Sequence, residues 1–395
     1  MQRLFLLLLL VVTPSVFMLF LPEHFETPKY FFILFLLAFS ILNTKRGISL
    51  NILDKALLLY VIWYFLTTLF SVNFLVSFWG LPNHYTGSFI FILFLTFYLI
   101  LHKKFIEKLP LAYLLKVLVA SSLVPLFYGY LQLFSLDFIT WTKPLGGRVF
   151  STFGQPNFFA SYLGVILLSL VILILEKKHY KYLPFIVSVF ILFLNTLSIS
   201  AFFALFLSFF IYAWSRRKYI NASFYIFLIF VLSLTFLLFG KPLINRLKVQ
   251  VYASSQNVVT NDTGKIRKIL FVSSLEQILN TPRVLLIGSG PETFVFFYKK
   301  APDLQFTSEA NLVFVNPHNF FLEEFFETGF VGFLFYLALV FLMLRSLTKA
   351  PSSVIPLFIL AYSFFNWPGP YVYFLLFFFS YYSLLRYFKY KVTHP

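Results

Sequence analysis

The 395-residue chain contains no cysteine, which excludes disulfide bonds, thiolate metal sites and thiol nucleophiles. Histidine is also scarce, with six residues scattered along the chain: His24, His84, His102, His179, His318 and His394. No two of them have the H-x-x-x-H spacing that places two ligands on one helix face, so we expect no protein metal site. Charged residues make up only 11% of the chain, which is too few for the surface of a soluble protein.

In place of charge, the chain has apolar and aromatic side chains. Hydrophobic residues reach 60% and aromatic residues 22%, and the mean hydropathy is +0.87. This composition predicts an all-α polytopic integral membrane protein. The net charge of +17 does not indicate nucleic-acid binding, because lysine and arginine gather in alternate short loops between the apolar segments.

The apolar segments predict about twelve transmembrane helices, with a large periplasmic loop between the ninth and the tenth. In chain order these spans cover residues 4–21, 30–43, 51–70, 87–101, 110–135, 157–175, 182–197, 200–214, 219–239, 318–344, 354–366 and 371–387. No small-residue cleavage site follows the first span, so it is predicted to stay uncleaved. The chain then divides into residues 1–240 with nine spans, the loop 241–316 with an amphipathic helix, and residues 317–395 with three spans.

The distribution of positive charge predicts the orientation in the membrane. Alternate loops carry neighbouring cations, such as Lys45 with Arg46. The short loops opposite hold little more than three cations: Lys29, Lys143 and Arg148. Because cytoplasmic loops are enriched in lysine and arginine, we expect both termini in the cytoplasm and the other loops outside.

The most polar stretch of the predicted spans is residues 317–332, P-H-N-F-F-L-E-E-F-F-E-T-G-F-V-G, which we expect to begin one unbroken membrane helix. On a helix, Asn319, Glu323 and Glu327 fall on one face, with His318 beside them. Such groups in an apolar span are costly unless they face a cavity or partners, which favours a functional site. A solvated helix end remains open, since acidic residues in a first turn also suit the helix dipole.

A second candidate segment is G-G-R-V-F-S-T-F-G-Q-P-N, residues 146–157, which ends just inside a predicted span. Arg148 is the only arginine of the short outside loops, and Asn157 stands at the start of the span. A cation beside a helix N-terminus is suited to a phosphate, and we favour this interpretation. The alternative is an interfacial arginine that meets a lipid phosphate.

A third candidate is the predicted amphipathic helix of residues 261–280. Its apolar face would be formed by Ile266, Leu270, Leu275, Ile278 and Leu279. Lys265, Arg267 and Lys268 cluster in its first turns, where a helix start and three cations favour a pyrophosphate. A helix that lies on anionic lipid would explain the same charges. The G-S-G-P sequence that follows at 288–291 lacks the Gly-Lys-Ser/Thr end of a phosphate loop and predicts a turn.

Four motifs follow one another along the chain in the order of a known family. They are a W-G-x(6)-G loop from Trp79, R-x-F-S-T-F-G-x-P-N at 148–157, R-x(14)-P-x(5)-G-x-G-P-x-x-F at 267–294, and H-N-x-x-L-x-x-x-x-E-x-G at 318–329. With these motifs the chain resembles the O-antigen ligase and polymerase family of bacterial membrane glycosyltransferases. One departure is S-I-S-A-F-F at 198–203, where members often carry Ser-Arg-Gly.

The resemblance implies transfer of a glycan from undecaprenyl diphosphate to an acceptor, at a periplasmic site of the bacterial cytoplasmic (inner) membrane, without metal or cofactor. It implies that His318 is the catalytic base and that Arg148 and Arg267 bind the diphosphate. The neighbouring charges of Lys265 and Lys268 would add to the same diphosphate site.

Supporting roles are expected for Asn157, Asn319, Glu323 and Glu327. On an unbroken helix Glu327 would lie about 13.5 Å along the axis from His318, at ~1.5 Å per residue. That is too far to orient the imidazole, so we expect Glu327 to have a structural or acceptor-side role and Glu323 to be the better orienting partner.

The expected partners are the lipid-linked glycan donor, membrane lipids and an acceptor, with no nucleic acid. We favour a lipid A core sugar as the acceptor. A polymerase that extends the lipid-linked glycan, or a protein O-oligosaccharyltransferase, would share the donor and stays an alternative. A twelve-span transporter or flippase is less favoured, because no two halves of the chain match and the polar residues gather in the outside loops.

Overall fold

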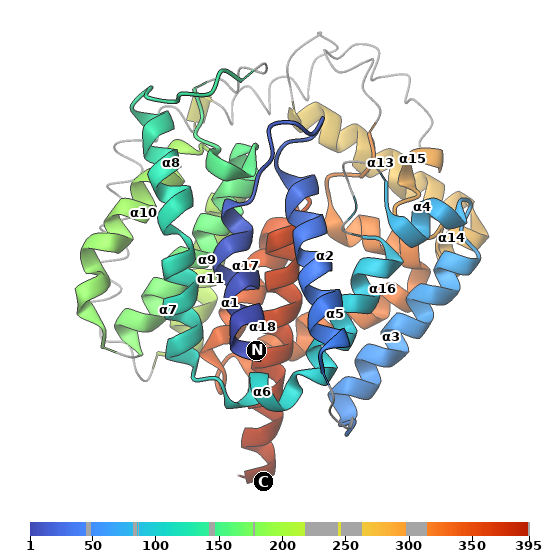
Figure 1. Ribbon diagram of the computed structural model, residues 1–395. Coiled ribbons are helices and arrows are strands. Elements are labelled where there is room, and N and C mark those ends of the chain that lie inside the picture. The colour runs from blue at the N-terminus through green and yellow to red at the C-terminus, as the bar shows by residue number, and fades with distance from the viewer. Residues whose placement is uncertain are drawn as a thin grey trace.

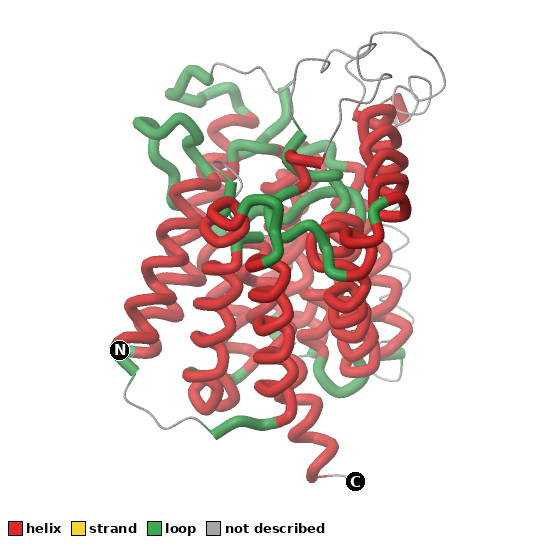
Figure 2. The backbone as a smooth tube through the Cα atoms, turned by 90° about the vertical axis from the view of Figure 1, so that its right-hand side faces the viewer, coloured by secondary structure: helices red, strands yellow, loops and turns green. Residues whose placement is uncertain are grey.

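The computed structural model describes residues 1–44, 49–81, 85, 87–141, 147–176, 178–217, 244–245, 263–297 and 314–393. Every regular element of these residues is a helix. The helices stand side by side, with both chain ends toward one end of the bundle and α13 (Thr263–Asn280) at the other (Figure 1). Figure 2 shows the long helices running between these two ends. We call the α13 end distal and the end with the chain termini proximal.

The first half of the chain contains α1 (Gln2–Leu7), the π-helical turn η1 (Leu8–Val12), the 3-10 turn η2 (Thr13–Ser15), α2 (Glu26–Leu42), α3 (Ile52–Leu69), α4 (Phe74–Trp79), α5 (Phe89–Leu101), α6 (Lys103–Lys108), α7 (Leu111–Ser121), α8 (Leu123–Leu133), η3 (Ser151–Phe153), α9 (Pro156–Leu175), η4 (Tyr180–Tyr182), α10 (Leu183–Asn195) and α11 (Ile199–Ser215). The second half contains α13, α14 (Pro282–Leu286), α15 (Phe294–Phe297), α16 (Phe320–Ser346), η6 (Pro351–Ser353), α17 (Val354–Ser363) and α18 (Pro370–Thr393).

The helices match the expected apolar architecture. Among the described residues, four stretches are long and apolar enough to cross a bilayer: Ile52–Leu69, Leu111–Leu133, Pro156–Leu175 and Phe320–Ser346. Shorter apolar helices occupy several of the other predicted spans. The all-helical, apolar fold is confirmed for this part of the chain. The number of twelve spans stays a prediction, and the ninth span at 219–239 lies outside the described residues.

The first predicted span, at 4–21, is shorter than expected. Its helical turns end at Ser15, and the backbone is extended at Val16 with ψ 123°. Pro14 explains the early end, because it has no N–H to donate to the carbonyl of Leu10 in an α-helix. The hydroxyl of Tyr371 donates to that carbonyl instead, at 2.7 Å.

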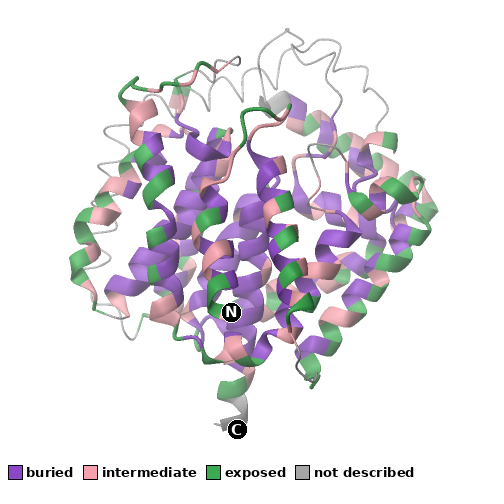
Figure 3. Ribbon diagram, viewed as in Figure 1, coloured by how far each residue is buried: buried purple, intermediate pink, exposed green. Residues whose placement is uncertain are grey.

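The core of the bundle surrounds α9. Buried residues fill the middle of the bundle around α9, α17 and α18, and exposed residues lie on outer helices such as α3 and α10 (Figure 3). A helix that is buried on all sides needs apolar residues on every face, which explains the continuous apolar sequence of α9. Gly164 lets α17 approach α9, since a Cβ there would lie 2.1 Å from Cζ of Phe358. This packing holds α9 and α17 in place beneath the distal end.

The apolar face of α13 packs on the protein. Ile266, Leu270 and Ile278 are buried against α14 and the first turns of α16, where Phe326 joins the same cluster. Leu279 differs from the prediction and is 67% exposed. The charged first turns of α13 are therefore fixed relative to the start of α16, and its apolar face is not available to lie on lipid.

Candidate active site

His318 lies in the loop that leads into α16, and the helix begins two residues later at Phe320. Asn319 is the N-cap, and its side-chain oxygen accepts the N–H of Leu322 at 3.1 Å. The backbone of His318 has φ 53°, a left-handed conformation that is uncommon outside glycine. Its N–H donates to Oδ1 of Asn316 at 3.0 Å, which stabilises that conformation. His318 therefore lies in the loop before the helix that carries Glu323 and Glu327, and two local side-chain contacts hold the backbone of this loop and of the helix start.

The ring of His318 is half-buried and meets the ring of Phe314 edge-on, with centroids 6.0 Å apart. Phe314 belongs to the apolar cluster that also contains Ile266 of α13. Arg267 is the next residue on that helix. The histidine is thus linked through this apolar cluster to the helix turn that carries the predicted diphosphate ligand.

The unbroken helix predicted from residue 318 onward is wrong at Gly329. This residue has φ 66° and ψ −170°, so α16 is broken there. The break separates carbonyls of the preceding turn from their helical donors, and the G-S-G-P segment supplies new donors to two of them. The N–H of Ser289 donates to the carbonyl of Phe326 at 2.9 Å, and that of Gly290 donates to the carbonyl of Glu327 at 3.0 Å. The predicted turn at 288–291 is therefore the element that completes the broken helix.

Three of the four sequence motifs meet at this junction. Glu292, two residues after Gly290, donates its N–H to the Glu327 carboxylate at 2.7 Å. The Glu292 carboxylate in turn accepts the N–H of Gly87, the last residue of the W-G-x(6)-G loop, at 2.7 Å. Glycines of these motifs therefore have a structural reason: Gly288 and Gly329 lie where two backbone segments meet, and a Cβ on Gly87 would lie 2.8 Å from the Glu292 carboxylate. Glu292 itself carried no signal in the sequence beyond its place beside the G-S-G-P turn.

Carboxyl groups are concentrated in the first turns of α16. Glu323, Glu324 and Glu327 are all buried. Glu324 accepts the Tyr60 hydroxyl of α3 at 3.2 and 3.3 Å, and was not singled out from the sequence. Glu327 holds the G-S-G-P turn through the N–H of Glu292, as described above. These contacts tie α3 and the loop before α15 to the start of α16.

Arg148 lies beside the first turn of α9. Its Nη2 donates to Oδ1 of Asn157 at 3.0 Å, and its Nε donates to the carbonyl of Thr196 at 2.7 Å. Pro156 begins the helix at a position where a missing N–H costs nothing. The placement predicted for Arg148 and Asn157, a cation at a helix N-terminus, is the one that the structure has.

Arg267 points from α13 toward the loop between α17 and α18. Its Nη2 donates to Oδ1 of Asn366 at 2.9 Å. The amide of Asn366 donates in turn to the hydroxyl of Ser200, at the start of α11. This is the turn where family members often carry arginine, so here serine positions a partner of Arg267. Lys268 is exposed beside it, and the side chain of Lys265 lies outside the described part of the chain.

The two arginines are anchored around one turn of the chain, between α10 and α11. Arg148 donates to the carbonyl of Thr196, and Arg267 donates to Asn366, which donates in turn to Ser200. Both guanidinium groups are only half-buried. Two cations from distant parts of the chain are therefore held around one turn at the distal end, which is an arrangement suited to an anionic ligand.

A buried contact between Lys29 and Glu26 supports the Arg148 segment, although the sequence indicated Lys29 only as one charge of a short loop. The ammonium of Lys29 donates to the carbonyl of Thr152 at 2.7 Å and to Glu26 Oε1 at 3.3 Å. Glu26 Oε2 packs against Gly369, where a Cβ would lie 2.3 Å away. Glu26 precedes the predicted span at 30–43, and its burial raises the pKa of its carboxyl to about 7, against the effect of the Lys29 charge.

Apolar helices with arginine, histidine and carboxylate side chains gathered at one end define an integral membrane protein with a polar site at that end. Residues 183–337 match the family model described as O-antigen ligase, so this segment is similar to that family. The resemblance is thereby confirmed. The matched segment contains Arg267, the G-S-G-P turn and His318, whereas Arg148 and Asn157 precede it. No curated protein matches the chain.

Proposed function

We propose that this protein is an O-antigen ligase-like glycosyltransferase of lipopolysaccharide biosynthesis. It moves a glycan from undecaprenyl diphosphate to a sugar hydroxyl of the lipid A core, at the periplasmic face of the inner membrane. The observation that carries the proposal is the anchoring of Arg148 and Arg267 around the turn between α10 and α11, together with His318 in the loop that leads into α16. The family match over residues 183–337 supports the same class of reaction.

The reaction forms a bond between the acceptor oxygen and the anomeric carbon of the glycan, and breaks the bond from that carbon to the diphosphate oxygen. His318 takes the proton of the attacking hydroxyl as a neutral imidazole, a step that typically contributes ~10²- to 10⁴-fold. Negative charge grows on the leaving undecaprenyl diphosphate. Arg148 and Arg267 stabilise that charge. Such electrostatic stabilisation of the transition state is large where the hydrogen-bond donors are oriented before the reaction begins.

The contacts of the two arginines favour such a role. Arg148 is oriented by a carbonyl and by the amide of Asn157, and Arg267 by the amide of Asn366. These neutral partners orient the planes of the guanidinium groups. Planar, oriented guanidinium groups match phosphate oxygens through paired hydrogen bonds.

The remaining predicted residues receive supporting roles in this proposal. Lys265 and Lys268 add positive charge for the diphosphate, Asn319 fixes the start of α16 beside His318, and Glu323 orients the imidazole. Glu327 has a structural role, because its carboxylate holds the turn that completes the broken helix. The reaction is proposed to need neither metal nor cofactor.

The orientation in the membrane follows from the same proposal. The cation-rich ends of α11 and α16 lie at the proximal end with both chain termini, and the candidate site lies at the distal end. The proximal end is therefore assigned to the cytoplasm and the distal end to the periplasm.

The test is transfer by the purified full-length protein in lipid nanodiscs, with undecaprenyl-diphosphate glycan and one of three acceptors: lipid A core, a second lipid-linked glycan, or a serine-containing peptide. His318→Ala, Arg148→Ala and Arg267→Ala are compared with wild type and with His179→Ala, a histidine substitution at the proximal end. We expect product on lipid A core alone, loss in the three site variants, no change in His179→Ala and no effect of chelator. Product on another acceptor would assign the protein to the polymerase or protein-glycosylating class. Full activity of His318→Ala would remove the proposed base.

A further inference from the structure

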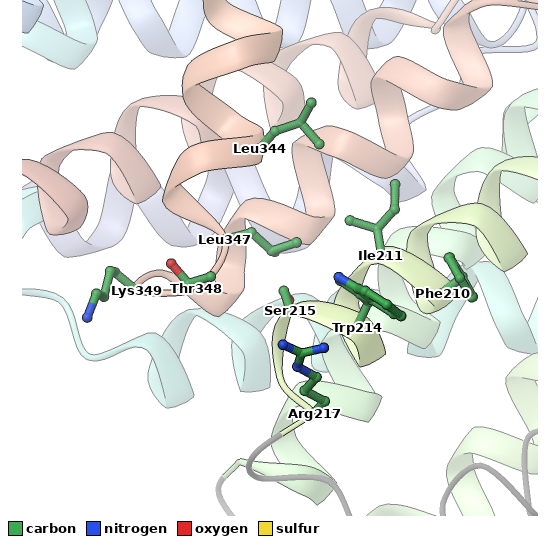
Figure 4. Close-up of a pocket in the computed structure, with 9 residues that line it drawn as sticks. All are labelled: Phe210, Ile211, Trp214, Ser215, Arg217, Leu344, Leu347, Thr348 and Lys349. Atoms are coloured by element: carbon green, nitrogen blue, oxygen red, sulfur yellow. The ribbon is translucent and has the colours of Figure 1, made fainter.

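A cavity of about 710 Å³ opens at the proximal end of the bundle, which is the end opposite the candidate active site. It lies between the last turns of α11 and α16, both of which pack against α17 (Figure 4). Its walls and rim are formed by Phe210, Ile211, Trp214, Ser215, Arg217, Leu344, Leu347, Thr348 and Lys349. The volume falls within the roughly 300–1,000 Å³ of typical small-molecule sites.

The walls and the rim of this cavity differ in character. Phe210 and Trp214 of α11 and Leu344 of α16 present exposed apolar surface to it. Arg217 and Lys349 carry charge at the ends of the two helices and are both exposed. A ligand that fills the cavity therefore meets apolar side chains along its length and positive charge at one end.

The two rim cations, Arg217 and Lys349, differ from the neighbouring Arg216 in the groups that they contact. Arg216 is neutralised by Glu176, with which its Nε and Nη2 make contacts of 2.6 and 2.7 Å. The guanidinium of Arg217 instead lies over the ring of Trp214, at 5.2 Å from the centroid. The ammonium of Lys349 lies over the ring of Tyr390 at 4.2 Å and donates to its hydroxyl at 3.0 Å.

Within the described part of the chain, no carboxylate contacts either Arg217 or Lys349. Aromatic rings beneath the two cations hold them at the rim and leave their charge directed outward. The rim thus carries two positive charges and no compensating negative one among these residues. Its chemical complement is an anion joined to apolar chains.

We propose that this cavity binds one anionic phospholipid, with its phosphate between Arg217 and Lys349 and an acyl chain along Phe210, Trp214 and Leu344. Basic pockets between membrane helices on the cytoplasmic side are suited to anionic lipid head groups. Tryptophan at this depth suits the boundary between head group and hydrocarbon. A bound lipid bridges the ends of α11 and α16, whose other ends carry Ser200 and Asn319 of the candidate site. Lipid binding therefore stabilises the folded protein.

The experiment measures lipid retention by native mass spectrometry and the melting temperature of the purified full chain, with vesicles of phosphatidylglycerol or of phosphatidylcholine. The charge variant is R217Q/K349Q, and its matched control is K178Q/K181Q, which removes two exposed cations from the same end outside the cavity. A second variant, Leu344→Trp, fills the cavity without changing its charge. None of these residues belongs to the candidate active site, so the result does not depend on glycan transfer.

We expect wild type and K178Q/K181Q to retain one phosphatidylglycerol and to melt higher with it than with phosphatidylcholine. R217Q/K349Q is expected to bind roughly thirtyfold more weakly, or about 2 kcal/mol for two cations near a membrane surface. Leu344→Trp is expected to lose retention as well. Equal loss in the control, retention by Leu344→Trp, or the same rise in melting temperature with inorganic phosphate alone would each overturn the proposal.

Discussion

Gly288 and Gly329 meet backbone to backbone at the break in α16. A Cβ on Gly288 would lie 2.2 Å from the carbonyl oxygen of Glu327, and a Cβ on Gly329 would lie 2.6 Å from the backbone nitrogen of Gly288. Neither distance is possible for a real side chain, so both residues must be glycine for the two segments to join. This junction fixes the loop between α14 and α15 against the helix that His318 precedes.

Gly329→Ala is expected to lower the stability of the protein more than a positive φ alone would explain. The backbone at φ 66° and ψ −170° is nearly exclusive to glycine, and such strain costs of order 1–3 kcal/mol. The backbone clash adds to this cost. The matched control is Gly147→Ala, which has φ 71° but no atom within 4 Å of its added Cβ. Melting temperatures in detergent decide the question, and an equal loss in both variants would remove the clash from the explanation.

The local parts of the site could be predicted from the sequence. Arg148 and Asn157 lie close together in the chain, and the proline between them marks a helix start, so their contact follows from short-range rules. The apolar helices could be predicted equally well, because α9 is almost entirely buried and its sequence is predominantly apolar.

Contacts between distant segments could not be predicted in the same way. Gly329 lies in a sequence that otherwise predicts a helix. The residues next to it do not indicate that the helix breaks there or that Gly288 packs against the break. Lys29 is a single charge in sequence, and only the fold brings Thr152 to it. The left-handed backbone of His318 depends on Asn316, a contact that helix periodicity does not describe. In each case a partner outside the local pattern decides the conformation.

Glu327 is expected to act as a hydrogen-bond acceptor for the fold. Glu327→Gln keeps a side-chain oxygen for the N–H of Glu292, so it should retain most of the transfer activity and stability. Glu327→Ala leaves that buried N–H without its acceptor, which costs about 1–3 kcal/mol. Both variants are measured for melting temperature and for initial rate of transfer. A Glu327→Gln protein that folds normally but is inactive would show that the carboxyl group itself takes part in the reaction.

Asn366 is expected to act through Arg267. Asn366→Ala removes the amide that orients the guanidinium, so donor binding should weaken by about tenfold, near the ~1.4 kcal/mol of one charge-assisted hydrogen bond. Asn366→Asp should weaken it further, because a carboxylate beside Arg267 competes with the diphosphate. Ser200→Ala, one contact farther away, should have a smaller effect. Dissociation constants for the lipid-linked donor test this order, and a stronger effect of Ser200→Ala than of Asn366→Ala would contradict it.

Glu26 is expected to make stability depend on pH. The raised pKa of its buried carboxyl, about 7 against 4.5 when exposed, means that the folded protein keeps a proton that the unfolded chain loses between these values. The stability contributed by Glu26 is therefore complete below pH 4.5 and is lost as the pH rises toward 7, by roughly 3 kcal/mol at most.

Glu26→Gln keeps an oxygen for Lys29 and has no proton to lose. We expect the melting temperature of Glu26→Gln minus that of wild type to increase between pH 5 and pH 8. The corresponding difference for Glu107→Gln, a half-exposed carboxylate at the proximal end, serves as the control for net charge. A difference that stays constant for Glu26→Gln over this range would show that the buried carboxyl is already ionised at pH 5.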